Sequence, residues 1–461
     1  MAPVFTNDAV VLGILLIVLA LIFHTSSSDN PAWKKFYRFI PALLLCYFIP
    51  ALLNWPFGLI APHWYESGIV DLAAQYDVVI GSGMSYDQIT QLLNEVGVPA
   101  SEYKAYQGHS QLYFVASRYL LPASLILLCL GIDFQGIINL GPKALIMFFA
   151  ATIGIILGGP IAVLVVSYVS PDVIPVTPDE LWRGLSTVAG SWIGGGANQT
   201  AMKEIFQVKD NLFGTMIVVD VVVANIWMGF LLYGANISDR LDLKLKADNS
   251  AIEDLKRRVS EYSAKVAQIP TTTWVFILLA VGFGGTALSH WGTDVITPFM
   301  ENFKERLVEL RLNSLMSSFF WLIVIATSFG LALSFTKARK LEGVGASRWG
   351  SVFIYILVAT IGMKMNIGEV LDNLGLFFVG IVWMLVHVII LLLVAYFIKA
   401  PFFFVAVGSQ ANIGGAASAP IVASAFSPSL APVGVLMAVL GYAMGTYGAI
   451  ICALLMQGVA S

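Results

Sequence analysis

Ten apolar stretches, each close to the length of a bilayer-crossing helix, dominate this chain. They lie near 9–24, 37–60, 111–132, 143–169, 212–236, 272–292, 314–336, 349–367, 373–399 and 430–458. A membrane-spanning helix needs roughly 20 such residues. Only 11% of the residues are charged, against about 25% in soluble domains. The sequence therefore predicts an all-α integral membrane protein with ten transmembrane helices.

Two further apolar stretches, 181–207 and 401–426, are interrupted by Gly, Ser, Asn and Pro. Basic residues favour the cytoplasmic ends of membrane helices. The basic cluster at 34–38 therefore places the first loop inside and the N-terminus outside. The basic linker 237–271 falls inside only if 181–207 enters and leaves on the outer side. The same reasoning makes 401–426 a re-entrant hairpin from the cytoplasm and places the C-terminus outside.

The two halves of the chain resemble each other. Gly-Ser-Trp-Ile-Gly-Gly-Gly-Ala at 190–197 is similar to Gly-Ser-Gln-Ala-Asn-Ile-Gly-Gly-Ala-Ala at 408–417, and Asn-Leu-Gly stands at both 139–141 and 373–375. Each half then holds five spans and one hairpin, and an odd number of spans inverts the second copy. Inverted repeats with matching broken helices indicate the binding site of a secondary transporter. The alternative is that small residues only allow close helix packing.

This pattern predicts a division of the chain into repeats and parts. In chain order we expect a first inverted repeat at 1–236 (scaffold 9–60, outer cap or oligomer contact 61–110, transport part 111–236), a cytoplasmic linker at 237–271, and a second repeat at 272–461 (scaffold 272–336, transport part 349–461). The transport parts would move against the scaffold as an elevator. A flat apolar scaffold suits a homodimer.

The hairpin tips are the candidate solute site. Consecutive glycines destabilise a helix interior and let the backbone approach a ligand, while unwinding frees N–H and C=O groups that need partners. The start of a returning half-helix suits a carboxylate, and freed carbonyls suit a sodium ion. The candidate solute-binding residues are Gly194, Gly195, Gly196, Ala197, Asn198, Gln199, Thr200, Ser409, Gln410, Asn412, Gly414, Gly415, Ser418 and Arg118.

Asp220 is the candidate ion-coupling residue, because a carboxylate inside an apolar span is costly and marks a functional site by default. Asn225 is expected about one turn away on a similar face, and both are candidate sodium ligands. Asp220 has two other interpretations: a structural acid bonded to a neighbouring helix, or a group that binds and releases a proton. Arg118 would clamp a substrate carboxylate or extend its charge to the membrane surface. His387 is expected to be a packed, hydrogen-bonded residue, and Lys203 is expected to pair with Glu204.

Three runs carry a resemblance to known proteins: Ser-Arg-Tyr-Leu-Leu-Pro-Ala-Ser-Leu at 117–125, Gly-Gly-Gly-Ala-Asn-Gln-Thr-Ala at 194–201 and Ala-Asn-Ile-Gly-Gly-Ala-Ala-Ser-Ala-Pro at 411–420. They look like hallmarks of the YjcL-like family of bacterial membrane proteins, whose activity is largely unassigned. In architecture the chain is similar to the sodium–glutamate symporter family (GltS-like) and, more distantly, to the citrate–sodium symporters. This resemblance implies sodium-coupled uptake of small carboxylates or amino acids by an elevator mechanism across the bacterial inner membrane. The glutamate symporters' own hairpin motif is missing, so only the position of the tips carries over.

We therefore expect a secondary transporter that couples sodium, or a proton, to the symport of a small organic anion, amino acid or short peptide. The alternative is a cation channel or cation–proton exchanger in which Asp220 alone is the functional site. An enzyme is not expected, because the spans lack a convincing Ser/His, paired-Asp or zinc arrangement, and the phosphate-binding motif of an ATP-driven pump is missing. We expect no cofactor beyond the coupling ion. The expected partners are a small-molecule solute, membrane lipids and a second copy of the chain, with no nucleic acid.

Overall fold

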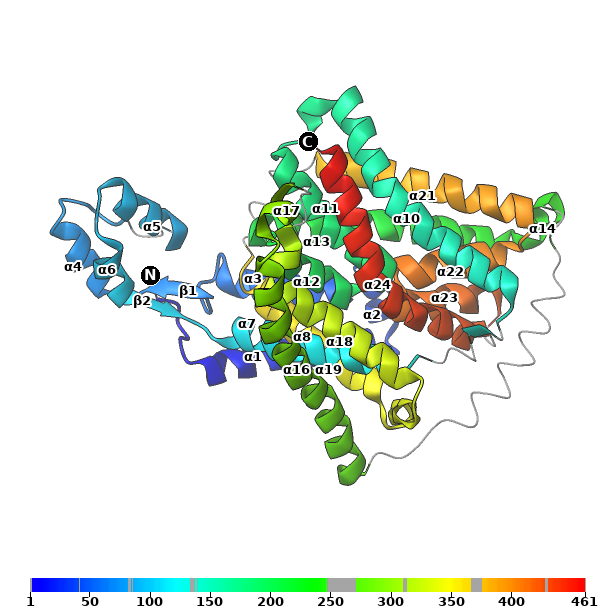
Figure 1. The fold of residues 1–461 in the computed structure, drawn as a ribbon, viewed down its shortest axis with the longest axis horizontal. Coiled ribbons are helices and arrows are strands. Elements are labelled where there is room, and N and C mark those ends of the chain that lie inside the picture. Colours follow the sequence, from blue (N-terminus) through cyan, green and yellow to red (C-terminus); the bar gives the residue numbers. More distant parts are fainter. Residues whose placement is uncertain are drawn as a thin grey trace. The chain divides into compact units, whose positions relative to one another are not determined.

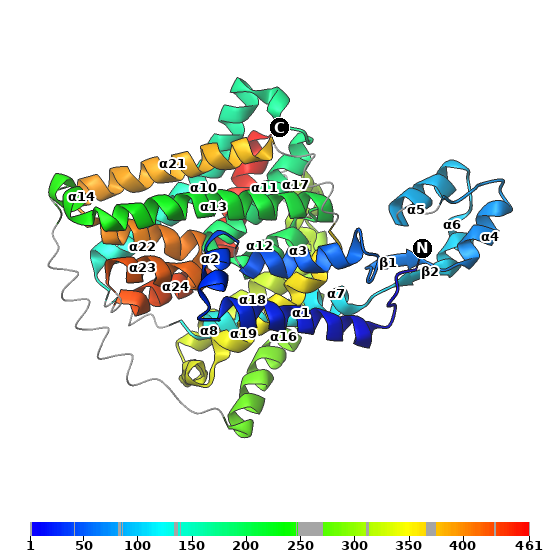
Figure 2. The same ribbon diagram turned by 180° about the vertical axis from the view of Figure 1, so that it is seen from behind.

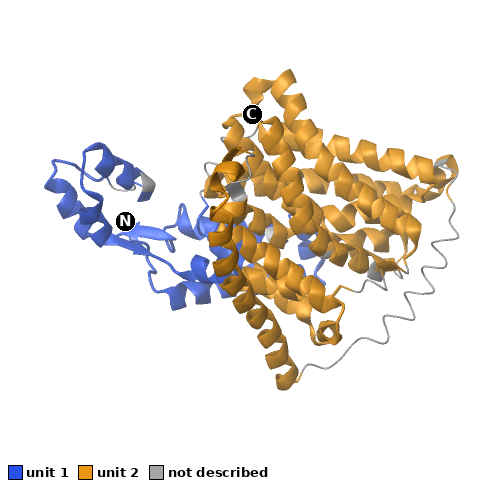
Figure 3. Cartoon of the chain, in the orientation of Figure 1, with its two compact units in different colours: residues 1–118, 355–368 blue, residues 119–354, 369–461 orange. Residues whose placement is uncertain are grey.

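The structure is a computed structural model that describes residues 2–40, 42–81, 84, 86–132, 137–138, 140–245, 247, 271–309, 313–365, 375–427 and 430–460. In this described part the chain is helical, apart from one two-stranded sheet (Figures 1 and 2). It divides into two compact units, residues 1–118 with 355–368 and residues 119–354 with 369–461 (Figure 3). Much of the predicted linker 237–271 and half of the residues of the paired Asn-Leu-Gly motifs fall outside the described residues.

The first unit combines apolar helices with a small segment that has its own core. Its elements are α1 (Asp8–Ser26), α2 (Pro31–Phe39), α3 (Ala42–Asn54), β1 (His63–Tyr65), α4 (Gly68–Ala74), α5 (Tyr86–Glu95), α6 (Ala100–Tyr103), η1 (Lys104–Tyr106), β2 (Gln107–His109) and α7 (Leu112–Val115). β1 and β2 pair antiparallel, with Tyr65 opposite Gln107. A cluster of buried side chains running from Tyr65 to Tyr103 packs within this segment. The predicted outer segment 61–110 therefore has its own hydrophobic core.

The second unit carries most of the long helices. Its described elements, with the two that cross the division between the units, are η2 (Ala116–Leu120), α8 (Leu121–Leu130), α10 (Pro142–Val169), η3 (Pro171–Val173), α11 (Pro178–Gly194), α12 (Gly196–Ile205), α13 (Asp210–Asn236), α14 (Ser238–Leu245), α16 (Thr272–Glu301), α17 (Lys304–Glu309), η4 (Asn313–Met316), α18 (Ser318–Ser334), η5 (Lys337–Val344), α19 (Ala346–Gly362), α21 (Leu376–Ile398), α22 (Phe402–Ile413), α23 (Gly415–Phe426) and α24 (Ala431–Val459).

Seven helices in the described part are long and apolar enough to cross a membrane, or eight if α18 and η5, bent by 97°, form one span. All seven fall on stretches that the sequence predicts as spans. Two more predicted spans contain only shorter apolar helices, Leu44–Asn54 and Ala346–Gly362. The chain is therefore a multi-pass membrane protein, as predicted, and the count of ten spans stays a prediction.

α21 illustrates why these helices suit a bilayer. Its buried side includes Trp383 and His387, whereas Leu385, Ile389 and Phe397 are exposed. A water-soluble helix would place polar residues on that exposed side. A helix with apolar residues all round is instead expected in lipid. The exposed apolar face of α21 is thus the surface that acyl chains would cover.

Two packing relations position the broken helix pairs in the second unit. α10 and α21, which precede the two pairs, lie side by side (Figures 1 and 2). The Trp383 indole N–H on α21 donates to the Ile155 carbonyl on α10 at 2.8 Å. α24 packs against all four helices of the broken pairs. The broken pairs are thus held between long helices from both halves of the chain.

Candidate functional site

Both glycine-rich tips break a helix. α11 ends at Gly194 and α12 begins at Gly196, and Gly195 between them has φ +78° and ψ −173°. That combination is essentially restricted to glycine. α22 ends at Ile413 and α23 begins at Gly415, where φ is +55°. α11 packs on α12 and α22 packs on α23, so each break joins two packed arms.

Asp220 on α13 is bonded to both arms of the first broken pair. Its Oδ2 accepts from the Ser191 hydroxyl at 2.6 Å and from the Gln199 amide at 3.1 Å. Its Oδ1 accepts from the Trp192 indole N–H at 2.7 Å. The side chain is buried, with 5% of its surface exposed. The carboxylate therefore bridges α11 and α12 across the break at Gly195.

All three of these donors are neutral. Among the described residues, no Lys, Arg or His nitrogen lies within 4.0 Å of the Asp220 carboxylate. A buried carboxylate without a cation is costly even when it is hydrogen-bonded. The arrangement favours a bound cation or proton, and it leaves capacity for one because Oδ1 receives a single hydrogen bond.

Two tip asparagines are each held by a threonine from the opposite half of the chain. Asn198 donates to the Gly194 carbonyl at 3.0 Å and accepts from Thr446 of α24 at 2.6 Å. Asn412 donates to the Gly408 carbonyl at 3.0 Å and accepts from Thr152 of α10 at 2.7 Å. Each asparagine thus bonds to the carbonyl four residues earlier and to a helix of the other half. The two broken pairs are fastened in the same way, although the asparagines lie on opposite sides of their breaks.

The bridge across the second break contains no carboxylate among the described residues. Gln410 on α22 donates from its amide to the Ser418 hydroxyl on α23 at 2.8 Å. In the first pair the serine is on the first arm and the glutamine on the second, with Asp220 between them. Among buried side-chain oxygens of the described residues, the amide oxygens of Gln199 and Gln410 have no hydrogen-bond partner.

The backbones of both tips meet at one glycine of α24. A Cβ added to Gly441 would lie 2.9 Å from the Ile193 carbonyl oxygen and 3.2 Å from the Ala411 carbonyl oxygen. Any residue larger than glycine would therefore press on both tips. In the described part of the chain, neither carbonyl receives a hydrogen bond, since each lies at the end of an interrupted helix.

His387 is buried and hydrogen-bonded, as predicted. Its Nε2 lies 2.8 Å from the Ser409 hydroxyl and its Nδ1 lies 3.2 Å from the Ala151 carbonyl. Because a carbonyl can only accept, Nδ1 carries the proton and the Ser409 hydroxyl donates to Nε2. The Trp227 indole also donates to Ser409, at 2.9 Å. Ser409 therefore fastens the first arm of the second pair to α21 and α13.

Two candidate residues, Asn225 and Thr200, bond to carbonyls of their own helices. The Asn225 amide donates to the Val221 carbonyl of its own helix at 2.7 Å, and Asn225 makes no hydrogen bond to Asp220 among the described contacts. Their spacing of five residues turns the side chains to different faces of α13. Arg118 belongs to the other compact unit. Thr200 bonds back to the carbonyls of Gly196 and Ala197.

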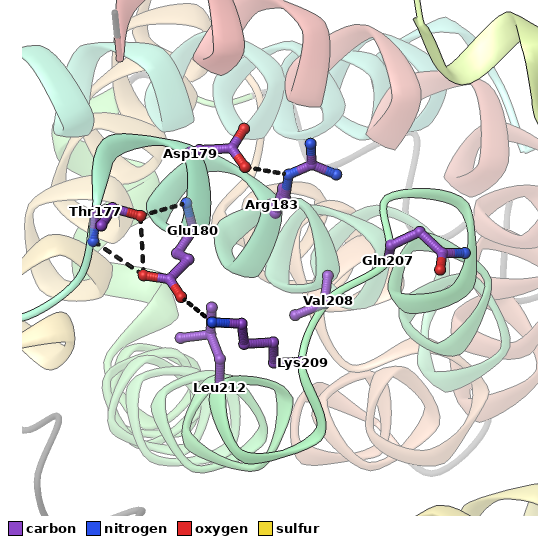
Figure 4. Close-up of a pocket in the computed structure, with 8 residues that line it drawn as sticks. All are labelled: Thr177, Asp179, Glu180, Arg183, Gln207, Val208, Lys209 and Leu212. Atoms are coloured by element: carbon purple, nitrogen blue, oxygen red, sulfur yellow. Dashed lines mark hydrogen bonds and ion pairs between the residues drawn. The ribbon is translucent and has the colours of Figure 1, made fainter. Parts of the chain in front are cut away.

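A pocket of about 330 Å³ lies at the far end of the first pair, lined by Thr177, Asp179, Glu180, Arg183, Gln207, Val208, Lys209 and Leu212 (Figure 4). Lys209 pairs with Glu180 at 2.6 Å, and Arg183 pairs with Asp179 at 2.8 Å. The hydrogen bond from Lys209, with two from Thr177, lowers the pKa of Glu180 to about 2. Paired charges and a capping box indicate that this end fastens α11 to α13.

Lys203, at the same end of the pair, is buried and lies next to two acids. It lies 3.4 Å from Glu204, which confirms the expected pair, and 2.8 Å from Asp210. Asp210 begins α13. The ion pair thus fixes the end of α12 to the helix that carries Asp220.

Comparison with known proteins assigns the chain to a family. A family model described as "Protein of unknown function (DUF819)" matches residues 87–459. The chain belongs to the DUF819 family. No curated protein matches the chain. The DUF819 match contains both broken pairs and Asp220, and it begins within the 61–110 segment.

The sequence does not predict the roles of several residues of this DUF819 site. Ser191 and Trp192 stand inside the quoted glycine-rich run, but nothing in the run indicates that they bond to Asp220. Thr152 and Thr446 are each the one threonine of an otherwise mostly apolar span. Their pairing with the asparagines depends on which helices cross, and the sequence of one chain does not carry that information.

Proposed function

We propose that this protein is a sodium-coupled secondary transporter that binds a small solute between the two helix breaks and works by an elevator mechanism. The observation that carries the proposal is the buried Asp220 carboxylate, whose hydrogen-bond donors among the described residues are all neutral and which bridges the two arms of a broken helix pair. A cation that joins this carboxylate would change the charge at the break. Ion binding would thereby be coupled to the position of the arms.

Helix lengths support a re-entrant path for both pairs. At about 1.5 Å per residue, the 12-residue helices α22 and α23 are each about 18 Å long, the 10-residue α12 is shorter, and the 17-residue α11 is about 26 Å long. The hydrocarbon core is about 30 Å thick. Such arms turn back inside the bilayer, where broken backbone is tolerated if protein or a water-filled cavity surrounds it.

The matched fastening of the two pairs supports inverted repeats. The helices that precede the pairs, α10 and α21, pack on each other, and each tip asparagine bonds to the opposite half. We take each half to consist of five spans and one broken pair, with α3 and α19 as short spans. In this scheme the pairs move with their neighbouring helices.

The first test measures sodium binding to the purified protein. Sodium chloride should raise its melting temperature more than an equal concentration of N-methylglucamine chloride, because an ion that binds the folded state stabilises it. Asp220→Asn should keep a cooperative melting transition and lose the sodium effect. Asp179→Asn, which removes an exposed carboxylate from the remote end of the same pair, is the control and should keep it.

The second test uses proteoliposomes. An inward sodium gradient should drive accumulation of a solute from a labelled mixture of amino acids, dipeptides and organic acids, and Asp220→Asn should abolish it. Sodium flux in the absence of solute would contradict the symporter proposal and favour a channel or a cation–proton exchanger. Sodium-driven accumulation by Asp220→Asn at the wild-type rate would remove Asp220 from the mechanism.

A further inference from the structure

The two glutamines that help to bridge the helix breaks each keep one free acceptor. Gln199 has none of its surface exposed and Gln410 has 2% exposed. Each donates its amide N–H across a break, to Asp220 and to Ser418 respectively. Each amide oxygen has no partner among the described residues. Buried amide oxygens are almost always paired in native proteins, so two matching exceptions need an explanation.

The direction of the Gln199 oxygen follows from its neighbour. Oδ2 of Asp220 can only accept when the acid is ionised, so the Gln199 atom that contacts it is the nitrogen. The oxygen then points away from the carboxylate, because the two ends of an amide diverge. The Gln199 amide oxygen, which has no partner at this break, is therefore a hydrogen-bond acceptor.

Charge favours a positive donor over a negative group at this place. Gln199 bonds directly to the Asp220 carboxylate, which no basic side chain among the described residues neutralises. The unpaired carbonyls of Ile193 and Ala411 add two more acceptors where the tips meet. An organic anion without N–H groups would find no donor on these oxygen atoms. An ammonium group brings donors and the opposite charge, and charge-assisted hydrogen bonds are the stronger ones.

We infer that the solute carries an ammonium group, as an amino acid or a peptide N-terminus does, and that this group donates to the free amide oxygens of Gln199 and Gln410. The inference rests on the proposed function, since it assigns the solute class of the same site. It narrows the three solute classes that the sequence leaves open to those with an amino group.

The test compares solutes that differ only in the amino group. Melting temperatures of the full-length protein in sodium chloride are measured with each protein amino acid, with a dipeptide mixture, and with propionate, succinate and glutarate, the desamino counterparts of alanine, aspartate and glutamate. At least one amino compound should raise the melting temperature, and its desamino counterpart should not. Equal stabilisation by the desamino acid, or no response to any amino compound while the sodium response persists, would overturn the inference.

Two substitutions at Gln410 distinguish its proposed contact with the ammonium group from its hydrogen bond to Ser418 across the break. Gln410→Met removes the acceptor and should weaken binding of the active amino compound about tenfold or more, which is the loss expected for one charge-assisted hydrogen bond. Gln410→Glu keeps oxygens facing both the solute and Ser418, and should retain binding. Gln207→Met makes the same change at an exposed position and is the matched control. Equal losses in Gln410→Met and Gln410→Glu would reduce Gln410 to a structural bridge and contradict the inference.

The sodium response distinguishes this inference from the proposed function. Asp220 accepts nothing from Gln410, so Gln410→Met should keep the sodium-induced rise in melting temperature. A wild-type protein without any sodium response would instead refute the sodium-coupled transporter itself.

Discussion

Gly195 has the backbone conformation that most clearly requires its residue type. Its φ of +78° and ψ of −173° place it where a side chain costs of order 1–3 kcal/mol. We predict that Gly195→Ala lowers the free energy of unfolding by about that amount, seen as a lower melting temperature. Gly229→Ala on α13 is the control, because an added Cβ there meets no atom within 4 Å and alanine favours a helix. Equal effects of the two changes would contradict this account of the break.

The Thr446–Asn198 hydrogen bond gives a second prediction at the residue scale. Thr446→Val leaves the buried Asn198 amide oxygen without its 2.6 Å donor, which costs about 1–3 kcal/mol. Thr215→Val should cost less, because Thr215 only bonds back to the Asn211 carbonyl of its own helix. Melting temperatures of the two variants, compared with the wild type, test this. A smaller loss for Thr446→Val than for Thr215→Val would show that the bond between halves is not stabilising.

At this scale the sequence predicts the unusual residues but not their partners. Asp220 is visible as an acid in an apolar span, and the glycines are visible as helix breakers. The bonds from Trp192 to Asp220 and from Trp227 to Ser409 join residues far apart in sequence. Whether Asn225 or Ser191 contacts Asp220 depends on the rotation of α13 and on the neighbouring arm, which apolar periodicity does not fix in a span that is apolar all round.

The base of α11 gives a prediction at the scale of an element. The pKa of Glu180 is about 2 in the folded protein, below its ordinary value of 4.5. A lowered pKa stabilises the folded state at pH values above the ordinary pKa, and this contribution is lost as the pH falls from 4.5 towards about 2. Lys209 is largely exposed to solvent, so the contribution of the pair is about 1 kcal/mol or less.

The measurement compares Lys209→Met with the wild type across this pH range. The variant should melt at a lower temperature at neutral pH, and the difference should shrink as the pH falls below 4.5. Lys244→Met, on the exposed side of α14, is the matched control and should show no such narrowing. A difference that stays constant with pH would mean that Lys209 does not act through Glu180.

The sequence predicts helices well where apolar runs are long and poorly where other forces decide where a helix ends. The seven helices that are long and apolar enough to cross a membrane coincide with predicted spans, because run length alone identifies them. α3 contains Pro50, which interrupts backbone hydrogen bonding, and its apolar part covers only about half of the predicted span 37–60. The sharp bend between α18 and η5 is likewise not visible in an apolar average.

The 61–110 segment gives a prediction for the whole molecule. Its ends meet in the β1–β2 pair, where the Glu66 N–H donates to the Tyr106 carbonyl at 2.9 Å. Its buried side chains pack within the segment. Replacing 67–105 with Asn-Gly, which favours a tight hairpin turn, should therefore leave a protein that is monodisperse in detergent. Aggregation of this variant on size exclusion, while the wild type stays monodisperse, would show that the segment is needed for folding.

The two broken pairs are fastened alike but differ in charge, because among the described residues a carboxylate stands in the bridge of the first pair and not in that of the second. A transmembrane voltage acts on charges alone, at about 2.3 kcal/mol per elementary charge for each 100 mV. Under the proposed function, voltage would act on the first pair when it is empty and much less once a cation has neutralised it, and it would leave the second pair unaffected. The electrically driven half of the cycle would then be the return of the unloaded protein. Charge movement recorded without sodium, and lost in Asp220→Asn, would be its signature.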